Sequence, residues 1–141
     1  QGLTAAGREQ SDIDLQVGCP VALSNEIEPI IEARKKNIAF LMGAMGSENT
    51  NFYNLAYQRA GFEDDVKAIQ SLWLAGKRDE AIKRVPNAMV TEFGAFGDAE
   101  TVRSRFKAYE AVGINTLQLR MDFGPNKKHF EQLEQLMELL K

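Results

Sequence analysis

Only two segments of this chain alternate with the period of two that is typical of a β-strand, and a long helical region separates them. In residues 15–23 the large apolar side chains are Leu15, Val17, Cys19, Val21 and Leu23. Residues 116–121 repeat the pattern, with Gln118 and Arg120 on the face opposite the apolar one. Two strands can neither close a barrel nor bury both faces of a sheet, so the chain is short of strands for an α/β fold. Pro20 further predicts that pairing weakens toward the end of the first strand.

The rest of the chain has the spacing of helices. We expect helices over residues 25–43, 52–61, 63–76, 78–85, 87–93, 98–112 and 127–140, with a turn at 124–126. The helix that begins at Asp98 is the clearest, because Asp98 suits an N-cap and Gly113 suits the position just past the end. We find no internal repeat. The prediction is an α/β chain that is mostly helical, with two parallel strands.

Composition excludes several classes of function. The net charge of −3 is spread along the chain, so no basic stripe predicts nucleic-acid binding and no amphipathic basic run predicts a membrane surface. The single cysteine, Cys19, excludes an intrachain disulfide and is typical of a reducing cytoplasm. With one cysteine and one histidine, a metal site built on these residues is not expected. Cys19 lies on the apolar side of its strand and is predicted to be a small core residue.

Four stretches, in this order and spacing, resemble one known family. They are residues 43–54 (GAMGSENTNFYN), 69–81 (IQSLWLAGKRDEA, followed by Val85-Pro86), 97–103 (GDAETVR) and 111–114 (AVGI). The combination resembles the C-terminal region of luciferase-like monooxygenases, especially the members that depend on the deazaflavin coenzyme F-420. The resemblance covers nearly the whole chain.

The resemblance implies the C-terminal part of a TIM-type (β/α)8 barrel. Residues 15–23 would be strand seven, 116–121 strand eight, 98–112 the helix between them and 127–140 the closing helix. Residues 24–97 would form a helical excursion over the catalytic face. Such a barrel typically needs about 250 residues, so the strands one to six would be missing and residues 1–141 would be one partial domain. The first residue, Gln1, also suits a processed or partial chain.

The implied function is that of an oxidoreductase or monooxygenase that uses coenzyme F-420 or flavin mononucleotide (FMN) in the complete protein. The isolated chain is expected to bind no cofactor tightly and to be inactive. Its strand edges predict pairing with a missing N-terminal barrel half or with a second copy, and hence a homo-oligomer. The alternative is a non-catalytic, self-associating α-rich module. No pair of residues predicts a general acid and base, so the catalytic residues stay unknown.

The candidate site residues fall into two groups. Apolar and aromatic residues of the excursion could line a pocket or lid over a flat ring, or could simply pack its helices: Phe40, Met42, Met45, Phe52, Tyr53 and Tyr57. Arg120 ends the second strand and could grip a phosphate or carboxylate, or could instead form a salt bridge with Asp122 or Glu92. Gln16 and Gln118 share the same inward face, where they could bond to each other or reach a ligand.

Overall fold

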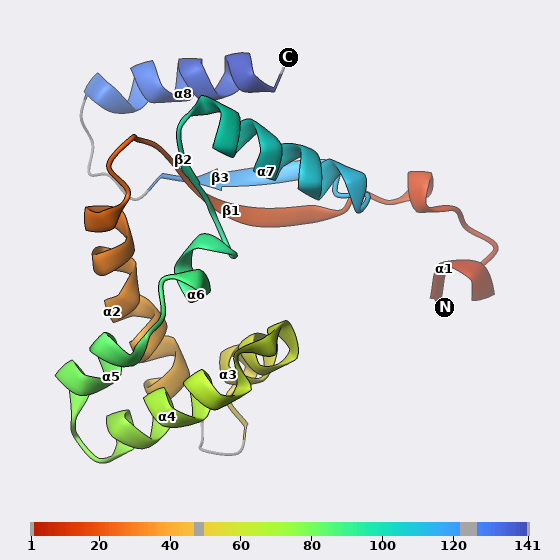
Figure 1. Ribbon diagram of the computed structural model, residues 1–141. Helices are drawn as coiled ribbons and strands as arrows, with labels where there is room; N and C mark the ends of the chain where they lie inside the picture. The colour runs from red at the N-terminus through yellow and green to blue at the C-terminus, as the bar shows by residue number, and fades with distance from the viewer. Residues whose placement is uncertain (1, 47–49, 122–126, 141) are drawn as a thin grey trace. The chain divides into compact units, whose positions relative to one another are not determined.

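The chain forms two compact units in the computed structural model, which describes residues 2–46, 50–121 and 127–140. Residues 1–25 and 94–141 make up one unit, called here the sheet unit, and Glu26–Phe93 make up the helical unit. Each is described by itself. Figure 1 shows the strands gathered in the sheet unit, while α2 to α6 belong to the helical unit. No described helix has the length and apolar character needed to cross a membrane.

The sheet unit contains a parallel sheet of three strands in the order β2-β1-β3. Its elements are α1 (Gly2–Ala5), the short 3-10 helix η1 (Gln10–Asp12), β1 (Gln16–Leu23), β2 (Ala95–Gly97), α7 (Ala99–Ala111), β3 (Thr116–Arg120) and α8 (Lys127–Leu139). The two predicted strands are present, and they pair in parallel as expected. The predicted turn at residues 124–126 lies outside the described residues.

The expected count of two strands is wrong, because β2 was assigned to the helical excursion. With only three residues and a glycine at its end, β2 is too short to show any periodicity. It pairs with β1 along Val21–Leu23, so it covers part of the β1 edge that was expected to be unpaired. The predicted helical excursion of residues 24–97 therefore includes a strand as well as helices.

Pro20 lies in the central strand, at the point where β1 changes its partner. The ladder with β3 ends at Pro20, which is opposite Arg120, and the ladder with β2 begins at Val21. The Leu15 carbonyl accepts from the Thr116 amide at 3.2 Å, so odd residues of β1 point their backbone groups toward β3. The backbone groups of Pro20 point away from β3. The ladder with β3 therefore does not need the backbone N–H that proline lacks.

Helices cover one face of this sheet. The core beneath them consists of Cys19, Val21, Ala95, Val102, Phe106 and Leu136, with Leu23, Tyr109, Leu117, Leu119, Met121 and Leu139 packed around it. As expected, the apolar face of both predicted strands meets α7 and α8, and Cys19 is a fully buried core residue. The Asp98 side chain caps α7 by accepting from the Thr101 amide at 2.8 Å, and Gly113 follows the helix with a φ of 87°.

The helical unit has a core of its own. Its elements are α2 (Glu28–Ala44), α3 (Phe52–Tyr57), a π-helical turn η2 (Gln58–Phe62), α4 (Glu63–Leu74), α5 (Arg78–Arg84) and α6 (Ala88–Thr91). The predicted helices are present, and Pro29 lies in the first turn of α2 as expected. The core residues are Ile31, Ile38, Ala39, Met42, Val66, Ile69, Ala81, Val85, Met89 and Val90. The unit therefore buries apolar residues from four of its helices, α2, α4, α5 and α6.

Candidate functional site

The face of the sheet that α7 and α8 leave uncovered carries a row of bonded polar side chains. Gln118 donates from Nε2 to Oε1 of Gln16 at 2.8 Å, and Gln16 donates from Nε2 to Oδ2 of Asp14 at 2.5 Å. The hydroxyl of Thr116 donates to the other oxygen of Asp14 at 2.8 Å. The predicted bond between the two glutamines is confirmed. The side chains of Asp14, Gln16 and Gln118 thus use hydrogen bonds on one another. Arg120 is the next residue along β3 on the same face.

Arg120 lies across β1, directly over Gly18. A Cβ atom at Gly18 would be 3.1 Å from Nε, Cζ and Nη2 of Arg120, so the guanidinium rests where any other residue would place a side chain. Arg120 is exposed and ends β3, on the polar side of the sheet. A guanidinium held by its flat face keeps its N–H edges available for a phosphate or carboxylate. The salt-bridge alternative stays a prediction, because Asp122 is outside the described residues and Glu92 belongs to the helical unit.

A hollow of about 460 Å³ opens at the carboxyl ends of β1 and β2. It is lined by Leu23, Ser24, Asn25, Asp98, Ala99, Gln135, Glu138 and Leu139. The Asp98 carboxylate in this hollow already caps α7 by accepting from the Thr101 amide. The hydrogen bonds from Thr101 also hold the pKa of Asp98 below its ordinary value. An anion would meet like charge in this hollow, so the guanidinium of Arg120 is the better candidate for an anion contact.

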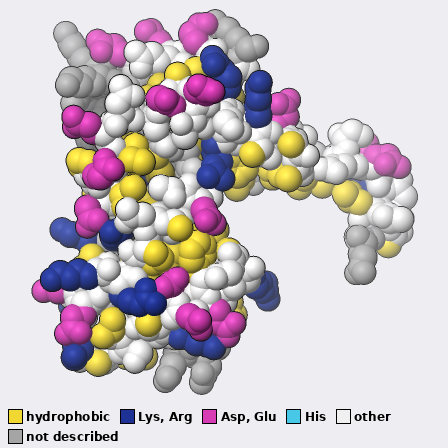
Figure 2. Space-filling model, in the orientation of Figure 1, with side chains coloured by type: hydrophobic (Ala, Val, Ile, Leu, Met, Phe, Trp, Pro, Cys, Tyr) yellow, Lys and Arg dark blue, Asp and Glu magenta, His cyan; other side chains and the backbone are white. Residues whose placement is uncertain are grey.

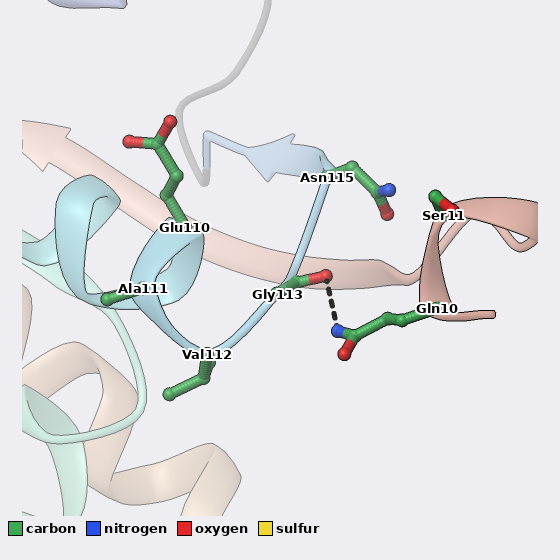
Figure 3. A pocket seen from close by; sticks show the side chains of 7 residues that line it. All are labelled: Gln10, Ser11, Glu110, Ala111, Val112, Gly113 and Asn115. Carbon is green, nitrogen blue, oxygen red and sulfur yellow. Dashed lines mark hydrogen bonds between the residues drawn. The ribbon is translucent and has the colours of Figure 1, made fainter.

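A second hollow, of about 450 Å³, lies at the opposite end of the sheet (Figure 3). Gln10 reaches across it and donates from Nε2 to the Gly113 carbonyl at 3.5 Å. Asn115 accepts from the Leu15 amide at 2.6 Å at the start of β1. These contacts join η1 and the beginnings of β1 and β3. Since parallel α/β folds place their chemistry at the carboxyl ends of the strands, we assign this hollow to the stability of the sheet.

Two of the predicted pocket residues pack inside the helical unit. Met42 is fully buried in the core, as the packing alternative expected. Tyr57 lies against Phe62 and Phe93, with its ring centroid 4.4 Å from that of Phe93. Burial raises the pKa of the Tyr57 hydroxyl, while the nearby Arg34 opposes the rise. In this conformation Met42 has no surface to offer a ligand.

The other four predicted pocket residues are exposed, and three of them take part in two separate aromatic contacts. Phe40 meets Trp73 edge to face with centroids 6.0 Å apart. Phe52 and Tyr53 form another edge-to-face pair at 5.7 Å, and Phe52 is 74% exposed. Met45 is 37% exposed. The structure thus brings Phe52 and Tyr53 together, but it gives Phe40 and Tyr57 different partners. The pocket that these residues could line stays a prediction.

Sequence reasoning missed two buried asparagines that join α2 to α3. Asn51 donates from Nδ2 to the carbonyls of Leu41 and Met42 at 2.7 and 2.9 Å, and it accepts from the Asn54 amide at 3.0 Å. Asn54 in turn accepts from Gln58 at 2.5 Å. An asparagine just before an apolar helical run is a known N-cap signal, and Asn51 could have been found by it.

Comparison with known proteins supplies the family. The family model described as luciferase-like monooxygenase matches residues 1–116. This chain belongs to that family. A protein of Mycobacterium tuberculosis with the provisional name coenzyme F-420-dependent oxidoreductase is 29% identical over 112 residues, which are 79% of this chain and 32% of that protein. The 5,10-methylenetetrahydromethanopterin reductase of Methanopyrus kandleri is 28% identical over 130 residues, 91% of this chain and 35% of the reductase. The chain thus spans about a third of the length of these curated relatives.

Proposed function

We propose that this luciferase-like chain is part of an oxidoreductase that uses the deazaflavin coenzyme F-420 or reduced FMN. The observation that carries the proposal is the family match over residues 1–116, together with a relative whose name states dependence on coenzyme F-420. The bound cofactor would supply the hydride or oxygen chemistry. The protein would supply binding, orientation and a site from which water is excluded.

In this proposal β1 and β3 are the seventh and eighth strands of a TIM-type barrel. Two features support it. The strands are parallel neighbours joined through α7, and α7 and α8 pack on the apolar face of their sheet. The uncovered face, with Gln16, Gln118 and Arg120, would then point into the barrel. The helical unit follows the carboxyl end of β1, where inserted segments of such barrels lie over the catalytic face, so we assign it the role of a lid or pocket wall.

Arg120 is the residue of this chain that we propose to contact the cofactor. FMN carries a phosphate, and coenzyme F-420 carries a phosphate and carboxylates, so both offer the anion that a guanidinium binds with two parallel hydrogen bonds. The exposed position of Arg120 over Gly18, at the end of β3, fits such a group. Gly18 supports the same contact, because a larger residue would displace the guanidinium from the sheet.

The contact can be tested with two flavins that differ only in a phosphate. The Arg120 Nε–H resonance of the labelled chain is followed by NMR during titration with FMN and, separately, with riboflavin. We expect FMN to shift this resonance at about millimolar concentration and riboflavin to leave it in place. Arg120→Gln should abolish the difference between the flavins, and Arg120→Lys should retain part of it because the charge remains. Equal shifts with both flavins would contradict an anion contact at Arg120.

The alternative, a non-catalytic module that associates with itself, is less well supported. It would require a surface that suits a second copy of the chain. The comparisons instead match enzyme families over most of the sequence. In Figure 2, positive and negative side chains are interspersed over the visible face rather than gathered in one region. We therefore keep the oxidoreductase as the proposed function.

A further inference from the structure

Three side chains of β3 reach diagonally across β1 on the polar face of the sheet. Each one meets the β1 residue two positions before its own partner in the strand register. The resulting pairs are Thr116 with Asp14, Gln118 with Gln16, and Arg120 with Gly18. The first two pairs are hydrogen bonds, whereas the third has no side chain on β1, because residue 18 is glycine. The guanidinium of Arg120 therefore lies at the level of Gln118, which is the register partner of Gly18.

The Asp14 carboxylate determines which way two amides of this face point. An ionised carboxylate has only acceptors, so Gln16 must present Nε2 to Oδ2 of Asp14, at 2.5 Å. Oε1 of Gln16 is then turned toward Gln118, which meets it with Nε2 at 2.8 Å. Oε1 of Gln118 is the remaining acceptor of this chain of bonds, and no donor among the described residues is bonded to it. The polar row thus ends on an oxygen whose orientation is set by Asp14.

The amide oxygen of Gln118 and the guanidinium of Arg120 offer opposite chemistry to a ligand. Both residues are exposed, and they are the last two of β3 on the polar face, at the carboxyl end where parallel barrels bind ligands. A guanidinium only donates, so it suits a phosphate. An amide oxygen only accepts, so it would repel the phosphate oxygens and suit a donor group close to them. A ligand that satisfies both residues carries a donor on the carbons next to its phosphate.

The charge of Asp14 is compatible with an anion at Arg120. Gly18 lies four residues beyond Asp14, which is about 13 Å along β1. Charges on a protein surface are largely screened beyond about 8 Å at physiological ionic strength. The carboxylate also accepts one hydrogen bond on each oxygen, from Thr116 and Gln16. Asp14 can therefore orient the amides without strongly repelling the anion.

We propose that Gln118 determines the ligand class of the Arg120 site, which is a phosphate ester with a hydroxyl group close to the phosphate. The hydroxyl donates to Oε1 of Gln118, and Asp14 is a positioning residue that acts through Gln16. The inference rests on the proposed anion contact at Arg120 and adds a second contact to it. FMN and coenzyme F-420 both belong to this class, because in each the phosphate ends a chain of hydroxylated carbons.

Two small phosphate esters test the proposal on the full chain: hydroxyethyl phosphate and methoxyethyl phosphate. They carry the same charge, and the methoxy group lacks the hydroxyl donor. Both are titrated against the isotope-labelled chain, with the Nε–H resonance of Arg120 reporting the phosphate and the side-chain carbonyl carbon of Gln118 reporting the hydroxyl. We expect the hydroxyl ester to bind about three- to tenfold more tightly, the range for one net hydrogen bond, and to be the ester that shifts the Gln118 carbonyl.

The same titrations separate this inference from the proposed function. Equal affinities, with Arg120 responding to both esters, would overturn the role of Gln118 and leave the anion contact in place. If Arg120 responds to neither ester, the anion contact and the inference built on it both fail. A stronger response to the methoxy ester would also contradict the proposal, because the group presented by Gln118 would then be a donor.

Variants assign the preference to particular residues. Gln118→Leu should bind both esters equally, while Gln10→Leu, at the opposite end of the sheet, should keep the wild-type preference. Asp14→Asn should reduce the preference, because an amide can meet Gln16 with either its oxygen or its nitrogen. A merely structural Asp14 would change stability alone, so an unchanged preference in a folded Asp14→Asn would overturn the positioning role. Gln118→Met replaces Gln118→Leu if circular dichroism shows loss of structure, and a preference retained by the folded variant would refute the assignment to Gln118.

Discussion

The contact between Gly43 and Trp73 gives a prediction in which two effects of known sign compete. Gly43 lies near the end of α2, and a Cβ atom built there would be 2.1 Å from Cγ and 2.4 Å from Cβ of Trp73. Replacing a helical glycine by alanine ordinarily stabilises a helix by about 1 kcal/mol. Here the added methyl must displace an indole that also contacts Phe40 and Arg78, and overpacking of this kind typically costs about 1–3 kcal/mol. We therefore expect Gly43→Ala to lower the free energy of unfolding by up to about 2 kcal/mol.

The indole can be removed to test this reasoning. In a Trp73→Ala background the clash is absent, so Gly43→Ala should now stabilise the chain by up to about 1 kcal/mol. The four proteins of this double-mutant cycle are compared by urea unfolding, followed by circular dichroism because Trp73 is the only tryptophan. Gly2→Ala, where no atom lies within 4 Å of the added methyl, serves as the control. An equal effect of Gly43→Ala in both backgrounds would refute the account.

Three further predictions concern the asparagine joint, the packing of α8 and the cap of α7. Asn51→Asp keeps the cap acceptor but loses both donors to the α2 carbonyls, so it should lower the free energy of unfolding by about 2–4 kcal/mol in urea titrations, and a smaller loss would show that water replaces the bonds. Leu136→Ala should cost about 2–5 kcal/mol in the same assay, whereas Met137→Ala, at the next position of α8 and 51% exposed, should cost far less; equal costs would mean that α8 is rotated. Because the pKa of Asp98 is lowered in the folded state, its contribution to stability is present above the ordinary value of 3.8 and is lost as the pH falls through the lowered value. The melting temperature of wild type should therefore fall toward that of Asp98→Asn in acid, and parallel curves would contradict the shift.

The long, regular elements of the chain were predictable because their signals are local. The alternation in β1 and β3 identified both strands and the face that meets the helices, and Asp98 with Gly113 marked both ends of α7. β2 was not predictable, because its three residues gain their conformation from pairing with β1 rather than from their own pattern. The position of Pro20 in the central strand likewise depends on which edge its backbone faces, and that direction follows from the register of the neighbouring strands.

The candidate site was predictable where it depends only on which face of a strand each residue occupies. The period of two placed Arg120 with Gln118 on the polar face, and the Gln16–Gln118 bond followed from it. The position of the guanidinium over Gly18 could not be predicted without the register between β1 and β3. The aromatic residues of the helical unit were harder, since a composition that suits a pocket also suits a core. Met42 belongs to the core, and only its packing could decide this.

Titration of this chain with its proposed cofactors tests the central claim most directly. The chain spans about a third of its curated relatives, and in our account the other barrel strands supply most of the cofactor pocket. Coenzyme F-420 and FMN are both fluorescent, so binding can be followed by their emission while the chain is added. We predict that neither binds with submicromolar affinity, and that the weak contact which remains depends on Arg120. Stoichiometric submicromolar binding of either cofactor, unaffected by Arg120→Gln, would contradict the account, because it would mean that the pocket lies within this chain and away from the polar face of the sheet.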